Sequence, residues 1–225
     1  MMLPKIIGLA GKKGCGKTTL ANYLDDEFGY KRMAFADPMK EMLMHSLHMD
    51  RETLEKMKRS GDVVDLSNGV KERITKAVCD ALGTDVSNDM DRTVFSNGDV
   101  TMRSLLQTIG TDIIRAYNDR WFIERVMPLA KWALYKGIPV VIDDVRFKNE
   151  ADAIYNAGGD TYYIERNGND DESSHPSENS LSADMFAEDK IIMNDGQIGD
   201  MAKYLFKQPS HGKCARKPTN EFVGS

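Results

Sequence analysis

Cysteine and histidine are scarce in this chain, whose 225 residues include three cysteines and four histidines. Cys15, Cys79 and Cys214 lie far apart and form no C-x-x-C pair, which argues against a disulfide framework and a structural zinc site. We therefore expect a cytoplasmic protein of a reducing compartment. Long apolar runs are also missing, and residues 1–14 lack the layout of a signal peptide, so no membrane association is expected.

The chain also lacks an excess of positive charge. The chain has 30 basic and 35 acidic side chains, for a formal net charge of −5. A broad surface for a nucleic acid polymer is therefore not expected. A local basic pocket for a small anion is compatible with this balance, and we expect small-molecule partners.

Short apolar runs alternate with amphipathic stretches along most of the chain. The expected strands cover 5–10, 31–36, 138–143, 161–165 and 190–193. The expected helices cover 17–28, 37–48, 102–117, 121–135, 147–157 and 197–206. Strands that are separated by helices predict an α/β fold, a three-layer sandwich with a five-stranded, largely parallel sheet. Ligands of such sheets bind at the carboxyl ends of the strands.

The segment 50–100 differs in character, because it is charged and has only scattered apolar residues. It predicts short helices near 51–59 and 70–82 and a loop over 87–99. We interpret it as a helical insertion in a single domain that covers 1–206, with core segments 1–49 and 101–206. The insertion could bind substrate, form a homodimer interface, or do both.

Two polar segments follow the fourth expected strand. Residues 167–180 contain no core residue and are a candidate lid loop, although this lid has no arginine of the kind that adenylate-kinase lids supply. Residues 207–225 form a polar tail that we expect to be disordered.

The segment GKKGCGKT, residues 11–18, matches the P-loop (Walker A) pattern G-x-x-x-x-G-K-[ST], with an apolar strand before it and an amphipathic helix after it. Backbone N–H groups of such a loop surround phosphate oxygens at a helix N-terminus. Lys17 is expected to reach the β- and γ-phosphates of ATP, and the Thr18 hydroxyl to bind Mg²⁺. The expected ATP-binding residues are Gly11, Lys12, Lys13, Gly14, Cys15, Gly16, Lys17, Thr18 and Thr19.

A P-loop alone does not name a reaction, because GTPases, motors and kinases share it. The chain has no N/T-K-x-D motif of the kind that reads guanine in GTPases. Motor proteins and helicases are usually longer and more basic. A small-molecule kinase fits best.

Six segments and Trp121 together carry a family resemblance: GLAGKKGCGKTT, FADPMKEML, RSLLQTIGTDIIR, VVIDDVRFKNEADAI, YYIERNG and HPSENSL. In this order they resemble the bacteriophage deoxynucleoside monophosphate kinase family over most of 1–206, the stretch 50–100 excepted. The resemblance implies ATP-dependent phosphorylation of deoxynucleoside 5′-monophosphates to diphosphates for DNA replication, with Mg²⁺. It also implies a core, a helical substrate-binding region and a lid, and, for a phage protein, the host cytoplasm.

The strand-end segment VVIDDVR provides a carboxylate for the metal and a cation for a phosphate. Asp143 and Asp144 compete for the place opposite Thr18, and the D-x-R pattern of the family favours Asp144. Arg146 would then bind a substrate phosphate, with Glu150 one turn later either orienting it or forming a surface ion pair with it.

Arg166 ends the fourth expected strand, before Asn167 where the family usually has proline. It could stabilise the transferred phosphoryl group or stack on adenine. Lys17, Asp144, Arg146 and Arg166 are thus the candidate catalytic residues.

The candidate substrate-binding residues outside that segment lie on helices and in the lid. Arg103 and Gln107 are four residues apart and share a helix face, where arginine can bind a phosphate and glutamine can read a base edge. The glycine in Gly110-Thr111-Asp112 suggests close approach of a ligand or a break in the helix. The remaining candidates are Asp37, Lys40, Thr111, Asp112, Arg115, Trp121 and His175. Structural alternatives exist for several of these: a helix N-cap for Asp37, a solvated lysine for Lys40, a core aromatic for Trp121 and a lid hydrogen bond for His175.

Two other functions stay open at this point. One is a P-loop kinase for another small acceptor, such as dephospho-coenzyme A or a sugar acid. The other is a nucleotide-binding switch without catalytic activity, which would bind ATP but release no ADP in response to an acceptor.

Overall fold

The computed structural model describes residues 5–96, 98–166 and 180–207. Its centre is a five-stranded sheet in the order β2-β3-β1-β4-β5, in which every neighbouring pair is parallel. The strands are β1 (Ile6–Ala10), β2 (Lys31–Met33), β3 (Val140–Ile142), β4 (Asp160–Glu165) and β5 (Ile191–Met193). This confirms the predicted α/β fold and the number of strands.

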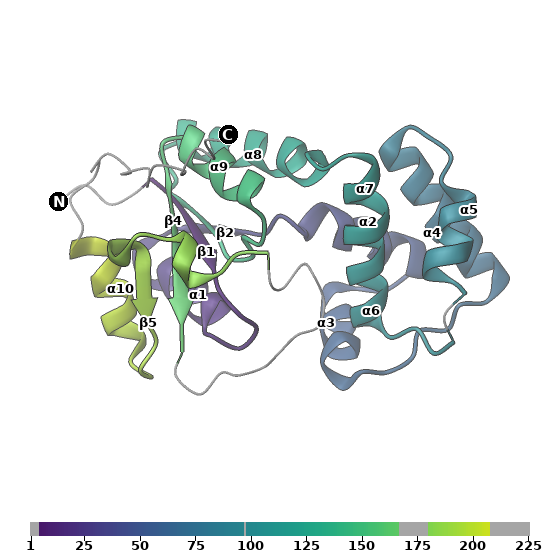
Figure 1. Ribbon diagram of the computed structural model, residues 1–225, viewed down its shortest axis with the longest axis horizontal. Helices are drawn as coiled ribbons and strands as arrows, with labels where there is room; N and C mark the ends of the chain where they lie inside the picture. The colour runs from purple at the N-terminus through teal and green to yellow at the C-terminus, as the bar shows by residue number, and fades with distance from the viewer. Residues whose placement is uncertain (1–4, 97, 167–179, 208–225) are drawn as a thin grey trace, which may run out of the picture.

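Helices cover both faces of the sheet, as the alternation of side chains along each strand requires. Ile7 and Leu9 of β1 face α1 (Lys17–Phe28) and α10 (Ile198–Lys207), which pack against each other. Ile6 and Ala10 belong to the hydrophobic cluster on the opposite face, which α8 (Trp121–Tyr135) and α9 (Lys148–Asn156) cover. Figure 1 shows α1 and α10 on one side of the strands and α8 and α9 on the other.

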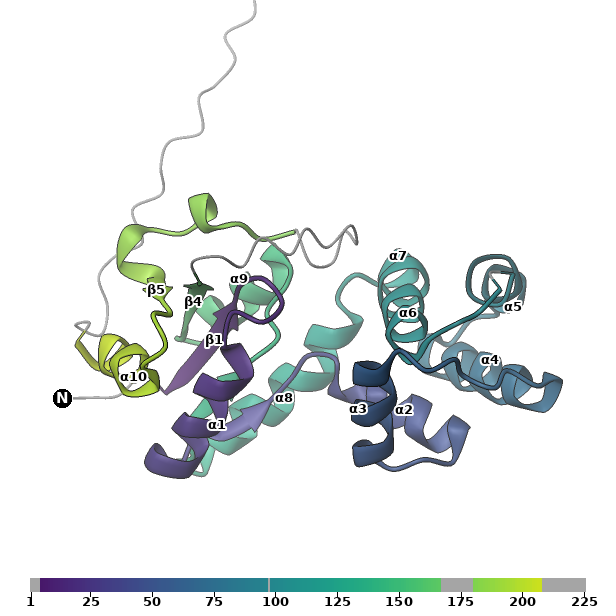
Figure 2. The same ribbon diagram turned by 90° about the horizontal axis from the view of Figure 1, so that it is seen from below.

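The remaining helices form what we call the helical lobe, residues 37–117, beside the carboxyl ends of the strands (Figures 1 and 2). It contains α2 (Asp37–Leu47), α3 (Arg51–Ser60), α4 (Asn68–Leu82), α5 (Ser87–Asp89), the π-helix η1 (Met90–Val94), α6 (Met102–Gln107), the π-helix η2 (Thr108–Ile114) and α7 (Arg115–Tyr117). Helices therefore occupy part of 87–99, where a loop was expected. The lobe is also wider than the predicted insertion 50–100, because α2 packs on α4 and α3 packs on α6.

The expected helix 102–117 is present over its whole length, but its middle is the π-helix η2. Gly110 lies in η2, where a Cβ would stand 3.2 Å from Sδ of Met39 and 3.8 Å from the ring of Phe122. The glycine therefore permits close approach of α2 and α8, and the π-helical turn rather than a helix break accommodates it.

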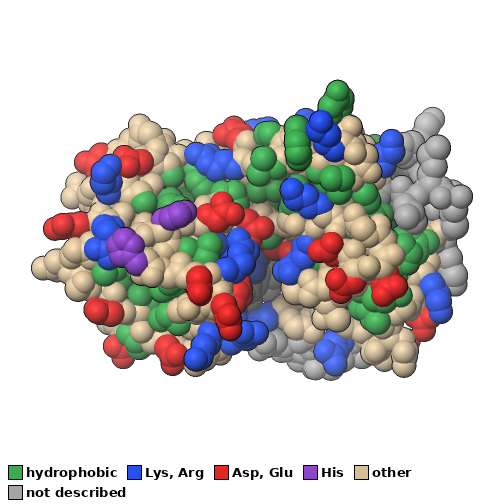
Figure 3. All heavy atoms as spheres, turned by 180° about the vertical axis from the view of Figure 1, so that it is seen from behind, with side chains coloured by type: hydrophobic (Ala, Val, Ile, Leu, Met, Phe, Trp, Pro, Cys, Tyr) green, Lys and Arg blue, Asp and Glu red, His purple; other side chains and the backbone are tan. Residues whose placement is uncertain are grey.

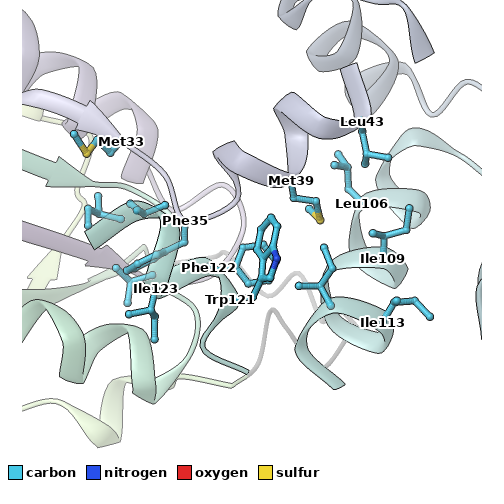
Figure 4. Close-up of a cluster of buried hydrophobic side chains, with 14 of the residues drawn as sticks. Met33, Phe35, Met39, Leu43, Leu106, Ile109, Ile113, Trp121, Phe122 and Ile123 are labelled. Atoms are coloured by element: carbon cyan, nitrogen blue, oxygen red, sulfur yellow. The ribbon is translucent and has the colours of Figure 1, made fainter. Parts of the chain in front are cut away.

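One continuous hydrophobic cluster joins the helical lobe to the sheet. Figure 4 shows Trp121 and Phe122 of α8 between Phe35, which follows β2, and the lobe residues Met39 and Ile109. All five side chains are buried. The two parts of the molecule thus share a core.

Two 3-10 turns, η4 (Ala183–Met185) and η5 (Glu188–Lys190), precede β5. Among the helices of the described residues, none combines the length and the apolar character that crossing a bilayer would take. Most of the candidate lid and nearly all of the tail, residues 167–179 and 208–225, lie outside the described residues, and so does His175.

Candidate active site

The P-loop follows the last residue of β1 and ends at the start of α1. Gly11 and Gly16 have φ angles of 136° and 108°, which L side chains rarely adopt. A Cβ on Gly11 would also lie 2.4 Å from the carbonyl oxygen of Ile164 in β4. The amide of Asn194, after β5, donates to the Cys15 carbonyl at 2.7 Å and so attaches the loop to the sheet.

The Lys17 ammonium lies over the P-loop itself. Its Nζ donates to the carbonyl oxygens of Gly11 and Lys12 at 2.6 and 2.7 Å. The guanidinium of Arg166 also reaches the loop, because its Nη1 is 3.4 Å from the Gly14 carbonyl oxygen. Two cations that sequence analysis assigned to catalysis are therefore at the phosphate loop.

Asp143, at the end of β3, is the acid that contacts the P-loop. Its Oδ2 accepts a hydrogen bond from the Thr18 hydroxyl at 3.1 Å. The same oxygen accepts from Nε and Nη2 of Arg32 at 2.9 and 2.8 Å, and Arg32 also donates to Asn22 of α1. The carboxylate is buried, so these donors supply the charge and hydrogen bonds that water would otherwise provide.

Asp144 points elsewhere, contrary to the interpretation that placed it opposite Thr18. Its two oxygens accept hydrogen bonds from the backbone N–H groups of Phe35 and Ala36 at 2.6 and 2.9 Å. Adjacent side chains on an extended backbone point in opposite directions, which explains why only one of the pair reaches Thr18. These bonds also explain why β2 ends at Met33 rather than at residue 36. Burial raises the pKa of Asp144, and the charge of Asp143 adds to the rise.

Glu150, in the first turn of α9, is buried and has three hydrogen-bond donors. Oε2 accepts from the backbone N–H groups of Arg146 and Phe147 at 2.8 and 3.1 Å, and Oε1 contacts the guanidinium of Arg115. The Arg115 guanidinium also lies 3.8 and 4.7 Å from the ring centroids of Phe147 and Phe122. Burial raises the pKa of Glu150 to about 7, although Arg115 opposes the rise.

A cavity of about 180 Å³ lies between the P-loop and the helical lobe. Its cationic lining residues are Lys13, Lys17, Lys58, Arg103 and Arg146. Lys58 belongs to α3 and Arg103 to α6, so both parts of the molecule contribute cations. Figure 3 shows Lys, Arg, Asp and Glu side chains gathered where the core meets the helical lobe.

Ion pairs in the helical lobe position the cations of α2 and α3. Lys40 pairs with Glu55 at 2.9 Å, and Lys58 lies 3.5 Å from the other oxygen of Glu55. Burial lowers the pKa of Lys58, and the nearby charges of Lys40 and Arg103 lower it further. An anion in the cavity would relieve this repulsion, because it would balance the cations.

Residues 5–70 and 64–205 match the family described as deoxynucleotide monophosphate kinase. The chain belongs to this family. A relative from Acanthamoeba polyphaga mimivirus, provisionally described as a deoxynucleotide monophosphate kinase, is 30% identical over 212 residues. The match covers 86% of this chain and 90% of the relative.

The structure of this family member brings only some of the predicted site residues together. Gly11, Lys13, Gly14, Lys17, Thr18, Arg103 and Arg146 line the cavity. Cys15 is the buried residue of the loop, whereas Lys12 of the loop and Thr19 of α1 are exposed. Gln107 follows Arg103 by one turn of α6 but is not among the cavity-lining residues.

Other predicted substrate-binding residues have structural partners. Asp37 accepts from the backbone N–H of Ala34 and pairs with Arg51 at 2.8 Å. Trp121 is buried, and its indole N–H donates to the carbonyl oxygen of Ala81 in α4 at 3.0 Å, which fits the core-aromatic alternative. Thr111 and Asp112 lie in η2, where Asp112 is exposed.

Lys58, Arg32 and Asn194 were not predicted to be part of the site. Lys58 is one of several charged residues in α3, and no local pattern separates it from its neighbours. Arg32 follows a lysine in a short edge strand, where a solvated side chain is the ordinary expectation. Only the packing of β2 beside β3 brings Arg32 to Asp143.

Proposed function

We propose that this protein transfers the γ-phosphoryl group of ATP to a deoxynucleoside 5′-monophosphate. The observation that carries this function is the cavity in which the P-loop faces cations of the helical lobe, Lys58 and Arg103. Two polyanions have to meet in such a reaction, and cations from both sides reduce their repulsion. Membership of the deoxynucleotide monophosphate kinase family supports the choice of acceptor.

The P-loop amides and Lys17 would hold the β- and γ-phosphates of ATP. Arg146 and Arg103 would bind the phosphate of the acceptor, whose oxygen forms the new bond to the γ-phosphorus as the bond to the oxygen of the leaving ADP breaks. Because an acceptor phosphate oxygen is already anionic at neutral pH, the transfer needs no general base. Catalysis then consists of positioning and of stabilising charge.

Thr18 and Asp143 fit a Mg²⁺ site, because a hydroxyl and a carboxylate are the hard oxygen ligands that this ion prefers. The Thr18 hydroxyl and the Asp143 carboxylate are 3.1 Å apart. In this proposal Asp143 therefore takes the Mg²⁺-binding role that the family pattern had suggested for Asp144. The bound ion would neutralise part of the phosphate charge. Asp144 instead holds the loop between β2 and α2, and Glu150 fixes the backbone of Arg146.

Coupled-assay turnover with ATP and Mg²⁺ tests the acceptor directly. We expect diphosphate formation with at least one of the common deoxynucleoside monophosphates. The ribonucleoside monophosphates, dephospho-coenzyme A and a sugar acid serve as competing acceptors. Failure of all deoxynucleoside monophosphates would contradict the proposal. ATP binding without acceptor-dependent ADP release would support a nucleotide switch.

The Lys17→Met variant is the control for the P-loop. It removes the ammonium but keeps an unbranched side chain only one atom shorter, so the fold should remain and turnover should be lost. Lys5→Met, at an exposed position before β1, provides the matched change and should keep wild-type turnover. Unchanged turnover in Lys17→Met would remove the P-loop from the mechanism.

A further inference from the structure

Arg32 of the edge strand β2 contacts Asp143, the carboxylate to which we assign Mg²⁺ binding. The register of the sheet brings the two side chains together. Arg32 pairs with Val141 of β3, and Asp143 lies two residues after Val141, so it points to the same face of the sheet. Helix α1 covers this face, because Val141 belongs to the same hydrophobic cluster as Leu20 and Leu24 of α1. The ion pair is therefore held where the sheet edge meets α1.

Asp143 and Arg32 each contact α1, at positions one helical turn apart. Oδ2 of Asp143 accepts from the Thr18 hydroxyl at 3.1 Å, and Nη1 of Arg32 donates to Oδ1 of Asn22 at 3.0 Å. Because Thr18 and Asn22 are four residues apart, they lie on the same face of the helix. The Arg32 guanidinium is thus fixed from two sides, by Asn22 and by the carboxylate.

The donors to the Asp143 carboxylate gather on one of its two oxygens. Nε and Nη2 of Arg32 lie 2.9 and 2.8 Å from Oδ2, the oxygen that the Thr18 hydroxyl also contacts. Arginine frequently binds a carboxylate with one hydrogen bond on each oxygen, and Arg32 does not. In the part of the chain that the structure describes, no donor is within hydrogen-bond distance of the other oxygen, Oδ1. That oxygen is therefore available to a cation, for which a carboxylate oxygen is a suitable ligand.

The Thr18 hydroxyl can bind a cation without disturbing this arrangement. A hydroxyl has one proton and two lone pairs, so it can act as a metal ligand and still donate to Oδ2 of Asp143. Arg32 and Thr18 together would then hold Oδ2 while Oδ1 stays available. Hydrogen-bond partners of metal-binding side chains orient them, and the loss of such a partner typically costs about 10–100-fold in metal affinity or activity.

We propose that Arg32 is a positioning residue for Mg²⁺ binding, which fixes the Asp143 carboxylate so that Oδ1 can bind the ion or one of its water molecules. This role rests on the proposed phosphoryl transfer, because it requires the metal site formed by Thr18 and Asp143. Arg32 does not touch the reacting phosphates in this role and acts through Asp143 alone.

A purely structural role for Arg32 would be to balance a buried charge, since the Asp143 side chain is 4% exposed and that of Arg32 is 39% exposed. A lysine at position 32 distinguishes the two roles. Its ammonium supplies the same charge, but it is a point charge without the planar fork of arginine. It therefore cannot hold Asn22 and the carboxylate in one fixed geometry.

Titration calorimetry of the full chain with a non-hydrolysable ATP analogue, in Mg²⁺ and in EDTA, tests the proposal without any acceptor. In the wild type, Mg²⁺ should tighten binding of the analogue. Both Arg32→Met and Arg32→Lys should reduce this gain by about 10-fold or more. Their affinities in EDTA should equal that of the wild type, because the P-loop is intact. Lys31→Met, the matched change at the exposed neighbour on the opposite face of β2, should keep the full gain.

Urea denaturation of the same variants separates orientation from charge balance. Arg32→Met should be the less stable variant, because it leaves a buried carboxylate without its cation, whereas Arg32→Lys should be closer to the wild type. If Arg32→Lys restored the Mg²⁺ gain together with stability, Arg32 would only balance charge and the proposal would be overturned. Equal losses of affinity in Mg²⁺ and in EDTA would overturn it too. Both of these results leave the phosphoryl transfer standing, whereas a wild type without any Mg²⁺ gain would contradict the metal site itself.

Discussion

At the scale of single residues, three carboxylates near the end of β3 have three different tasks. Asp143 contacts Thr18 and Arg32, Asp144 accepts two backbone N–H groups, and Glu150 joins α9 to Arg115. All three are apparent in the sequence, because they follow an apolar strand closely. Their tasks are not, since the neighbouring strand and helices decide which donor each carboxylate reaches.

Exchanging each aspartate for asparagine separates the first two tasks. Asp143→Asn removes the charge beside Thr18, and we expect turnover at saturating ATP to fall by about 10²-fold or more. Asp144→Asn leaves an amide N–H facing a backbone N–H, and we expect it to lower the free energy of unfolding by about 1–3 kcal/mol. Mg²⁺ titration of turnover and urea denaturation measure the two effects. If the dependence of turnover on Mg²⁺ were lost only in Asp144→Asn, the proposed role of Asp143 as the Mg²⁺ ligand would be wrong.

Glu150 should make stability depend on pH. Its pKa is raised from 4.5 to about 7 by burial, so the folded protein holds this proton more tightly than the unfolded chain. The resulting stabilisation is complete below pH 4.5 and is lost as the pH rises through about 7. The difference in unfolding free energy between the wild type and Glu150→Gln should therefore shrink from pH 5 to pH 8.

Asp152→Asn, an exposed change on the same helix, is the control for that titration. It should show no comparable trend with pH. A difference between the wild type and Glu150→Gln that grows with pH would mean that Arg115 and the backbone amides outweigh burial.

At the scale of elements, hydrophobic periodicity was sufficient for most of the fold. The expected helices 17–28 and 121–135 have the observed bounds of α1 and α8, and the five strands occur where apolar runs predicted them. The exceptions depend on tertiary contacts. β2 is shorter because the backbone N–H groups of Phe35 and Ala36 donate to Asp144, and η2 is a π-helix at the place where α2 approaches Gly110.

Gly110 provides a test of that close approach. In an ordinary helix, alanine is more stable than glycine by about 0.5–1 kcal/mol, and Gly69→Ala in α4 should show this gain because the nearest atom is 3.8 Å away. At Gly110 the methyl group would press on the buried Met39, so we expect a net loss of about 1 kcal/mol. Thermal or urea unfolding of both variants measures the difference. An equal gain in stability at both positions would show that the Met39 side chain moves aside without an energetic cost.

At the scale of the whole molecule, the site is made where the core and the helical lobe meet. The P-loop half of this proposed site could be located in the sequence because eight consecutive residues make up its motif. The opposite half could not, because Lys58 and Arg103 come from separate helices that only the packing of α3 on α6 brings together.

Lys58 is the test of that second half. We expect Lys58→Met to lower turnover by about 10²-fold, because the cavity of the proposed site loses one of its cations. ATP affinity should change little, since the P-loop is intact. Lys56→Met, at an exposed position of the same helix, should behave as the wild type. Equal losses in ATP affinity and turnover would place Lys58 at the nucleotide instead.

The hydrophobic cluster that runs from the sheet into the helical lobe limits how this protein can be recombined with its relatives. Trp121, Phe122 and Met39 belong to the interior of both parts at once. A chimera that took only residues 37–117 from another family member would carry a foreign surface against α8. Transplanting acceptor preference between relatives therefore requires exchanging α8 together with the lobe.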